Sequence, residues 1–149
     1  MDKIYYSYED CVKDCKVLLP KIKSYNPDAL VSIARGGLTL GHLLACGLDT
    51  NNLYTINSIH YNDTKKLNSF HISNIPDLSK CKKVVLVDDI SDSGETLYEV
   101  KRLLEKKYLY CEFKIATIFY KRDAKIEPDY KVKEATKWIN FFWEVDLLK

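Results

Sequence analysis

The sequence lacks the features that mark several classes of protein. No apolar run approaches the roughly 20 residues that cross a bilayer, and the N-terminal residues do not form the apolar core of a signal peptide. We therefore expect a cytoplasmic protein without stable membrane insertion. The formal net charge of +2 is too small to indicate a nucleic-acid binder, and no repeat, linker or low-complexity tract is present.

The five cysteines include no Cys-x-x-Cys pair, and the three histidines show no metal-ligand spacing with them. We interpret the cysteines as the reduced thiols of a cytosolic protein. The chain has 149 residues, of which 46% are hydrophobic. That composition is enough for a compact core, so we expect residues 1–149 to form a single domain.

Helical and strand patterns alternate along the chain. Ser7 and Asp10 have the spacing of a capping box, which predicts a helix from there to about Tyr25 with a kink at Pro20. Further helices are expected over residues 38–46 and 97–107. Apolar runs predict strands over residues 30–34, 53–59, 70–72, 84–87, 113–120 and 137–142. Strands separated by helices of this length predict an α/β fold with a doubly wound, mainly parallel sheet.

Glycine is scarce, and its positions are informative. Three of the five glycines lie in two strand-to-helix loops, Gly36 and Gly37 in one and Gly94 in the other. Glycine permits a positive φ and the close approach of backbone amides to an anion. Ligands of open α/β sheets bind beyond the carboxyl ends of the strands, so we expect both loops at one ligand-binding edge.

The segment VVLVDDISDSGETL, residues 84–97, carries the strongest functional signal. A buried strand is followed by Asp88 and Asp89, then by a small polar loop and the start of a helix. A loop of small residues at a helix N-terminus binds phosphate. An acid pair next to such a loop indicates a ligand with phosphate, hydroxyl groups and a metal ion.

This segment resembles the signature of the type I phosphoribosyltransferases, which use phosphoribosyl pyrophosphate (PRPP). That signature is a hydrophobic strand, two acids, two loop residues and then Asp-[Ser/Thr]-Gly-x-Thr, and every position is filled here. The resemblance covers most of residues 30–144. It implies the type I phosphoribosyltransferase fold, with about five strands and a small hood from the C-terminal segment.

Three further stretches resemble the bacterial xanthine-guanine, or 6-oxopurine, branch of the family. SIARGGLTLGHLLACGL resembles its pyrophosphate loop, which implies that Arg35, Gly36 and Gly37 bind the leaving group and that the peptide bond before Arg35 is cis. ATIFYKR implies that Lys121 binds the exocyclic oxygen of the purine. WINFFWE implies that Trp138 lies against the base and that the backbone at Ile139 meets its 2-position.

The resemblance and the residue chemistry together imply a set of roles. Asp92 is expected to act as general base on the purine N7. The residues expected to bind the ribose and phosphate of PRPP are Asp88, Asp89, Ser91, Asp92, Ser93, Gly94, Glu95 and Thr96. Mg²⁺ is expected at Asp89, and residues 60–71 are expected to close over the site as a lid. Relatives commonly form homodimers or homotetramers, which we also expect here.

The chain departs from the family pattern at three places. Its lid offers Lys65 and Lys66 where the family has an arginine, Phe142 stands where a proline is usual, and Glu95 replaces the second loop glycine. Our expectation is a purine phosphoribosyltransferase of purine salvage, acting on PRPP and a 6-oxopurine such as guanine, xanthine or hypoxanthine. Two alternatives stay open: a pyrimidine phosphoribosyltransferase, and a non-catalytic regulator that senses PRPP.

Overall fold

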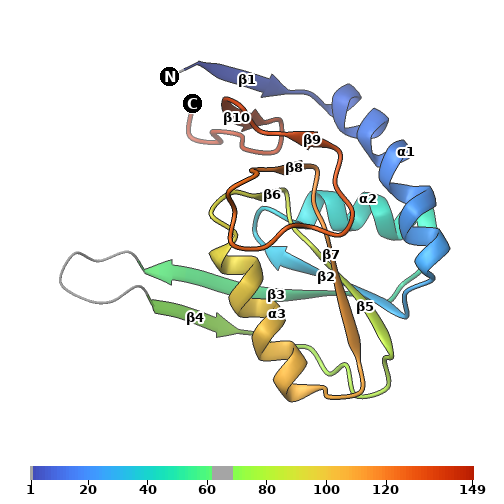
Figure 1. The fold of residues 1–149 in the computed structure, drawn as a ribbon. Helices are drawn as coiled ribbons and strands as arrows, with labels where there is room; N and C mark the ends of the chain where they lie inside the picture. The colour runs from blue at the N-terminus through green and yellow to red at the C-terminus, as the bar shows by residue number, and fades with distance from the viewer. Residues whose placement is uncertain (1, 62–68) are drawn as a thin grey trace.

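The centre of the fold is a five-stranded sheet in the order β4-β3-β2-β5-β7 (Figure 1). The computed structural model describes residues 2–61 and 69–149. The parallel strands are β2 (Ala29–Ala34), β3 (Leu53–Tyr61), β5 (Lys83–Val87) and β7 (Glu112–Ala116), and β4 (Ser69–Ser73) is antiparallel to β3. The expected mainly parallel sheet of about five strands is confirmed. Much of the expected lid, residues 62–68, lies outside the described residues.

Within the described residues, three helices cover the two faces of this sheet: α1 (Tyr8–Tyr25), α2 (Leu38–Leu48) and α3 (Glu95–Lys107). Leu30 and Val85 belong to one buried cluster, which also contains side chains of α1 and α2. Val31 and Leu86, the next residues along the same strands, belong to a second cluster with side chains of α3. Successive residues of a strand point to opposite faces, so the sheet is doubly wound as expected. No helix in residues 2–61 and 69–149 has the length and apolar character needed to cross a membrane.

Helix α1 begins where the capping box predicts. The Ser7 hydroxyl accepts a hydrogen bond from the Asp10 amide at 3.0 Å, and the Ser7 amide donates to the Asp10 carboxylate at 3.3 Å. These bonds satisfy two groups that have no partner within the helix. Pro20 lies inside the helix, which ends before Asn26 in the left-handed conformation, φ 57°.

Two small sheets form a hood over the main sheet (Figure 1). One pairs β1 (Lys3–Tyr6) in parallel with β10 (Trp138–Phe141). The other contains β6 (Ile90–Ser91), β8 (Phe119–Tyr120) and β9 (Lys133–Glu134) in the order β6-β8-β9. The expected C-terminal hood is therefore present, but it also includes the N-terminal strand, which we did not expect.

The expected single strand over residues 113–120 is wrong. Strand β7 ends at Ala116, and β8 begins at Phe119 in a different sheet. Between them, the Thr117 amide donates to the Tyr130 carbonyl at 3.0 Å, and the Thr117 hydroxyl donates to the Phe119 carbonyl at 2.8 Å. These bonds replace the main-sheet pairing and turn the chain into the hood.

One buried carboxylate fastens the hood to α1. The Tyr6 hydroxyl of β1 donates to Asp14 Oδ2 at 2.6 Å, and Lys133 Nζ of β9 lies 3.1 Å from the same oxygen. Burial, followed by the bond to Asp14, raises the pKa of Tyr6. Tyr6 also makes edge-to-face contacts with Phe119 and Phe141, at 5.2 and 5.7 Å between ring centres. The hood is thus held by polar bonds inside an aromatic cluster.

Candidate active site

The two acids of the signature lie at the carboxyl end of β5, held by backbone hydrogen bonds. The Asp89 amide donates to Asp88 Oδ1 at 2.9 Å, and the Ile90 amide donates to Asp89 Oδ1 at 2.7 Å. Loss of hydration raises the pKa of both carboxyls, and the neighbouring Asp89 charge raises that of Asp88 further. A cation or a set of hydroxyl donors at this position would relieve the repulsion between the two carboxylates.

The loop after β2 lies directly against this acid pair. A Cβ atom at Gly36 would lie 2.6 Å from Asp89 Oδ2, and one at Gly37 would lie 2.3 Å from the Val87 carbonyl oxygen. Only glycine fits at such distances. The Ala34–Arg35 peptide bond is cis, as the family resemblance implied. The residues predicted to bind pyrophosphate and metal are therefore neighbours.

The phosphate loop leads into α3 through Gly94, which is the N-cap of that helix. Gly94 has a φ of 79°, and a Cβ atom there would lie 2.8 Å from the Lys125 amide nitrogen. Because the N-cap is glycine, it offers no side chain to the amides of the first helical turn. The Ser93 hydroxyl accepts a bond from the Glu95 amide at 3.3 Å. Such a helix N-terminus can bind a phosphate group.

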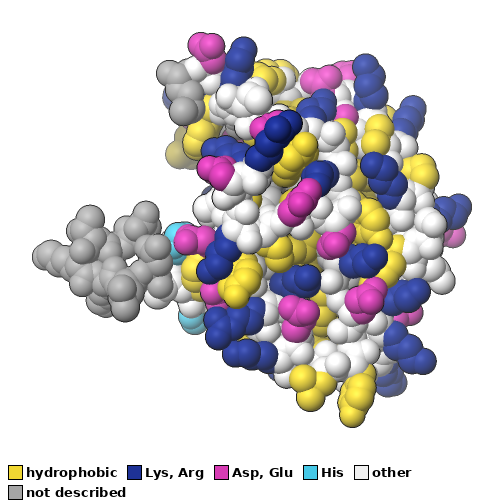
Figure 2. All heavy atoms as spheres, viewed as in Figure 1, with side chains coloured by type: hydrophobic (Ala, Val, Ile, Leu, Met, Phe, Trp, Pro, Cys, Tyr) yellow, Lys and Arg dark blue, Asp and Glu magenta, His cyan; other side chains and the backbone are white. Residues whose placement is uncertain are grey.

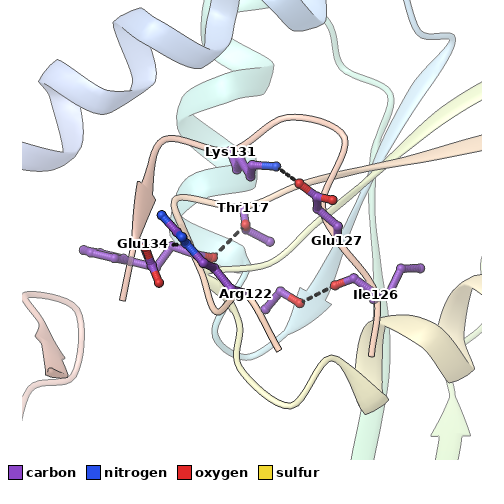
Figure 3. Close-up of polar contacts among 8 residues, drawn as sticks. Thr117, Arg122, Ile126, Glu127, Lys131 and Glu134 are labelled. Atoms are coloured by element: carbon purple, nitrogen blue, oxygen red, sulfur yellow. Dashed lines mark hydrogen bonds and ion pairs between the residues drawn. The ribbon is translucent and has the colours of Figure 1, made fainter. Parts of the chain in front are cut away.

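Ser91 differs from the rest of the loop because its side chain is buried. Its hydroxyl donates to the Ile126 carbonyl at 3.0 Å, a bond drawn at Ile126 in Figure 3. The Lys125 amide donates to the Ser93 carbonyl at 2.7 Å. The segment after β8 therefore packs onto the phosphate loop. In this structure Ser91 supports the loop from inside, and its predicted contact with PRPP stays a prediction.

Side-chain bonds hold the same segment in its path around the site. Arg122 Nε donates to Glu134 Oε2 at 3.0 Å, and Lys131 pairs with Glu127 (Figure 3). The backbone amide of Lys121 donates to the Ser91 carbonyl at 3.0 Å. The position of Lys121 is thus fixed relative to the phosphate loop.

The structure brings together Asp92 and Lys121, the predicted general base and the predicted purine-binding lysine. Lys121 Nζ lies 2.6 Å from Asp92 Oδ1, and the two side chains are 44% and 58% exposed. The bond to Asp92 raises the pKa of Lys121. A positive donor and a carboxylate acceptor at this distance can bind adjacent positions of one heterocyclic ring.

Arg35 lines a cavity of about 600 Å³ between the pyrophosphate loop and the C-terminal segment. Trp143 and Glu144 line the opposite side of this cavity. The charge of Glu144 also contributes to the raised pKa of Asp89. We did not assign Glu144 a role from the sequence, although the Trp143–Glu144 dipeptide matches the later Trp-acid pair of the family.

Trp138 and Ile139 lie on β10 in the hood. The Trp138 side chain is 55% exposed, whereas Ile139 is buried in the core that includes α1 and α2. Backbone pairing places Trp138 opposite Lys3 and Ile139 opposite Ile4. The part of these two residues in base binding stays a prediction.

The residues of the acid pair fit a magnesium ion that is shared with a substrate. Among residues 2–61 and 69–149, no group of three or more His, Cys, Asp or Glu side chains could hold a metal ion. Asp88 and Asp89 supply only carboxylate oxygens. Mg²⁺ prefers oxygen ligands and is commonly held by one or two carboxylates together with substrate phosphates.

Comparison with known proteins agrees with this geometry. The family model described as "Phosphoribosyl transferase domain" matches residues 4–149. A xanthine-guanine phosphoribosyltransferase of Cereibacter sphaeroides is 25% identical over 96% of this chain and 87% of its own. The structure of the xanthine-guanine-hypoxanthine phosphoribosyltransferase of Helicobacter pylori has a TM-score of 0.91 and 40% identity, covering 99% of this chain and 97% of its own.

A purine phosphoribosyltransferase structure from Pyrococcus horikoshii has a TM-score of 0.85 and 34% identity, covering 98% of this chain and 97% of its own. The fold is therefore the type I phosphoribosyltransferase fold, with its mainly parallel sheet and covering helices. The paired acids, the glycine loop and the phosphate loop stand at the carboxyl edge of that sheet, and this chain belongs to the phosphoribosyltransferase family.

Proposed function

We propose that the protein transfers the 5-phosphoribosyl group of PRPP to a 6-oxopurine, giving a nucleoside monophosphate and pyrophosphate in purine salvage. The observation that carries this proposal is the contact between Asp92 and Lys121, 2.6 Å apart beside the phosphate loop. The pair places a proton acceptor, the Asp92 carboxylate, next to a hydrogen-bond donor for an oxo group, the Lys121 ammonium. The relatives named above act on purines, which supports the same substrate class.

PRPP binds along the carboxyl edge of the sheet. The backbone amides of the loop from Ser93 to Thr96 hold the 5′-phosphate at the N-terminus of α3. Asp88 and Asp89 accept hydrogen bonds from the ribose hydroxyls. Arg35 and the amides of its glycine loop hold the pyrophosphate. Asp89 would hold Mg²⁺, which would supply positive charge to stabilise the departing pyrophosphate.

The purine binds on the other side of the ribose, against the hood. Lys121 donates a hydrogen bond to the oxygen at position 6, and Asp92 accepts the proton from N7 as the new bond forms at C1′. Trp138 covers one face of the base, and the backbone at Ile139 meets its 2-position. In the free enzyme the Lys121 ammonium pairs with Asp92, so both groups are positioned before the base arrives.

We further propose that residues 1–149 act as one cytoplasmic domain that assembles into a homodimer or homotetramer. The match of one family model to residues 4–149 supports the single domain. Lys121 distinguishes the proposal from a pyrimidine phosphoribosyltransferase and from a PRPP-sensing regulator, because neither role requires a donor for a 6-oxo group.

The experiment that tests the function measures pyrophosphate release from Mg-PRPP with guanine, xanthine, hypoxanthine, adenine, uracil and orotate. We expect turnover with one or more of the first three bases and loss of turnover when Mg²⁺ is chelated by EDTA. Turnover only with uracil or orotate would establish the pyrimidine alternative. PRPP binding without turnover of any base would establish the regulator.

A further inference from the structure

Glu95 is the departure from the family pattern that the proposed reaction leaves unexplained. It is the first residue of α3, and it places a carboxylate in the loop that is proposed to bind the 5′-phosphate. A negative side chain at a helix N-terminus stabilises an empty helix, but it repels a bound phosphate. An enzyme with this residue therefore needs a nearby group that offsets the charge.

The structure places His60 beside Glu95. His60 Nε2 of β3 lies 3.7 Å from Glu95 Oε2, and the two side chains are 27% and 34% exposed. His60 Nε2 is buried and has no hydrogen-bond partner among the described residues. The imidazole is also stacked on Phe70, its cross-strand partner on β4, at 4.4 Å between ring centres and 7° between planes. The stack holds the ring, so Nε2 has a fixed direction.

Other charged groups share a groove with Glu95. Glu95 lines a groove of about 960 Å³ between β4 and α3. The other titratable or charged residues that line it are His71, Glu99, Arg102, Lys106, Lys107 and Lys125. Figure 2 shows Lys and Arg side chains gathered over α3 on this face. Lys125 Nζ lies over the Tyr98 ring at 4.1 Å, and Arg102 pairs with Glu99 at 4.0 Å. Histidine is the side-chain type whose ordinary charge change falls between pH 5 and 8.

We propose that His60 is a positioning residue for PRPP, which acts by pairing with Glu95 when its imidazole is protonated. The ion pair holds the Glu95 carboxylate toward β3 and cancels its charge beside the phosphate loop. When the imidazole is neutral, Glu95 keeps its full charge and PRPP binds more weakly. This inference rests on the proposed function, because it requires PRPP in the loop.

The test is the dissociation constant of Mg-PRPP, measured by isothermal titration calorimetry between pH 5.5 and 8.5. We expect binding by the wild type to weaken with rising pH by about 3- to 10-fold more than binding by Glu95→Gln, since one partly exposed unit charge is removed. His60→Gln is expected to bind weakly at every pH. The double variant His60→Gln/Glu95→Gln is expected to match Glu95→Gln, because His60 acts only through the carboxylate.

His42→Gln is the control, an exposed histidine of α2 that is not part of the pair or of the expected lid, and its pH profile is expected to follow the wild type. Titration of the PRPP phosphates affects all variants alike, so only differences between profiles count. Parallel profiles for the wild type, Glu95→Gln and His60→Gln would overturn the inference while leaving the function intact. Absence of PRPP binding by the wild type at every pH would instead overturn the proposed function.

Discussion

Replacement of Lys121 by methionine tests how the enzyme chooses its base. Methionine keeps most of the length of the side chain and removes its hydrogen-bond donors. A hydrogen bond from a charged donor contributes about 1.5–3 kcal/mol net, and its loss corresponds to a fall in kcat/KM of at least about 10-fold for the 6-oxopurine. Adenine presents a donor at position 6, and lysine has no acceptor, so the wild type should use adenine far less well than guanine or hypoxanthine.

The structure separates this effect from a loss of stability. The Lys121–Asp92 pair is about half exposed, and exposed ion pairs contribute only about 0–1 kcal/mol to folding. The variant should therefore fold normally and keep the wild-type KM for PRPP. Arg122→Met is the control, because it also breaks an ion pair with a carboxylate, that of Glu134, in the same segment. Steady-state kinetics with each base would refute the assignment if adenine were used as well as guanine, or if Lys121→Met behaved like Arg122→Met.

Three other variants test separate parts of the structure. Asp92→Asn should lower kcat by roughly 10²–10⁴-fold with PRPP binding largely intact, and equal turnover in steady-state assays would show that the N7 proton leaves by another route. Gly37→Ala places a methyl group 2.3 Å from the Val87 carbonyl, so urea unfolding should show a loss of about 1–3 kcal/mol, and unchanged stability would contradict the close packing. Asp14→Asn removes the carboxylate that binds Tyr6, and we expect a similar loss of about 1–3 kcal/mol, whereas a wild-type melting temperature would show that the hood is held by its aromatic contacts alone.

Local signals in the sequence predicted the elements that local physics determines. The capping box of Ser7 and Asp10 predicted the start of α1, and both of its hydrogen bonds are present. The apolar run before Asp88 predicted β5, and the glycines after Ala34 predicted the loop that lies against Asp89. In each case the chemistry that decides the structure lies within a few residues of the signal.

The hood could not be predicted in the same way because long-range contacts determine it. β1 is mostly exposed and pairs with β10 at the other end of the chain, so the residue pattern of neither strand indicates which strand it pairs with. The run from Phe113 to Tyr120 is almost continuously buried, and its side chains do not reveal that the backbone changes sheets at Thr117. That change depends on the carbonyls of Asp89 and Tyr130, which the fold supplies from elsewhere.

The contrast between local signals and long-range contacts also applies to the site, and it has a functional consequence. The groups proposed for PRPP come from loops that follow neighbouring strands of the main sheet, and their order along the chain was enough to predict that they meet. Of the groups proposed for the purine, Asp92 lies on the phosphate loop, whereas Lys121 lies between β8 and β9 and Trp138 lies on β10, both within the hood. The segment that carries Lys121 is hydrogen-bonded to the phosphate loop at Ser91 and Ser93. The β1-β10 pair, which carries Trp138, is instead fastened to α1 through Tyr6 and Asp14, so substitutions in that pair should alter the choice of base with little effect on PRPP. Substrate preference can therefore change within this fold while the chemistry at the sheet edge is kept.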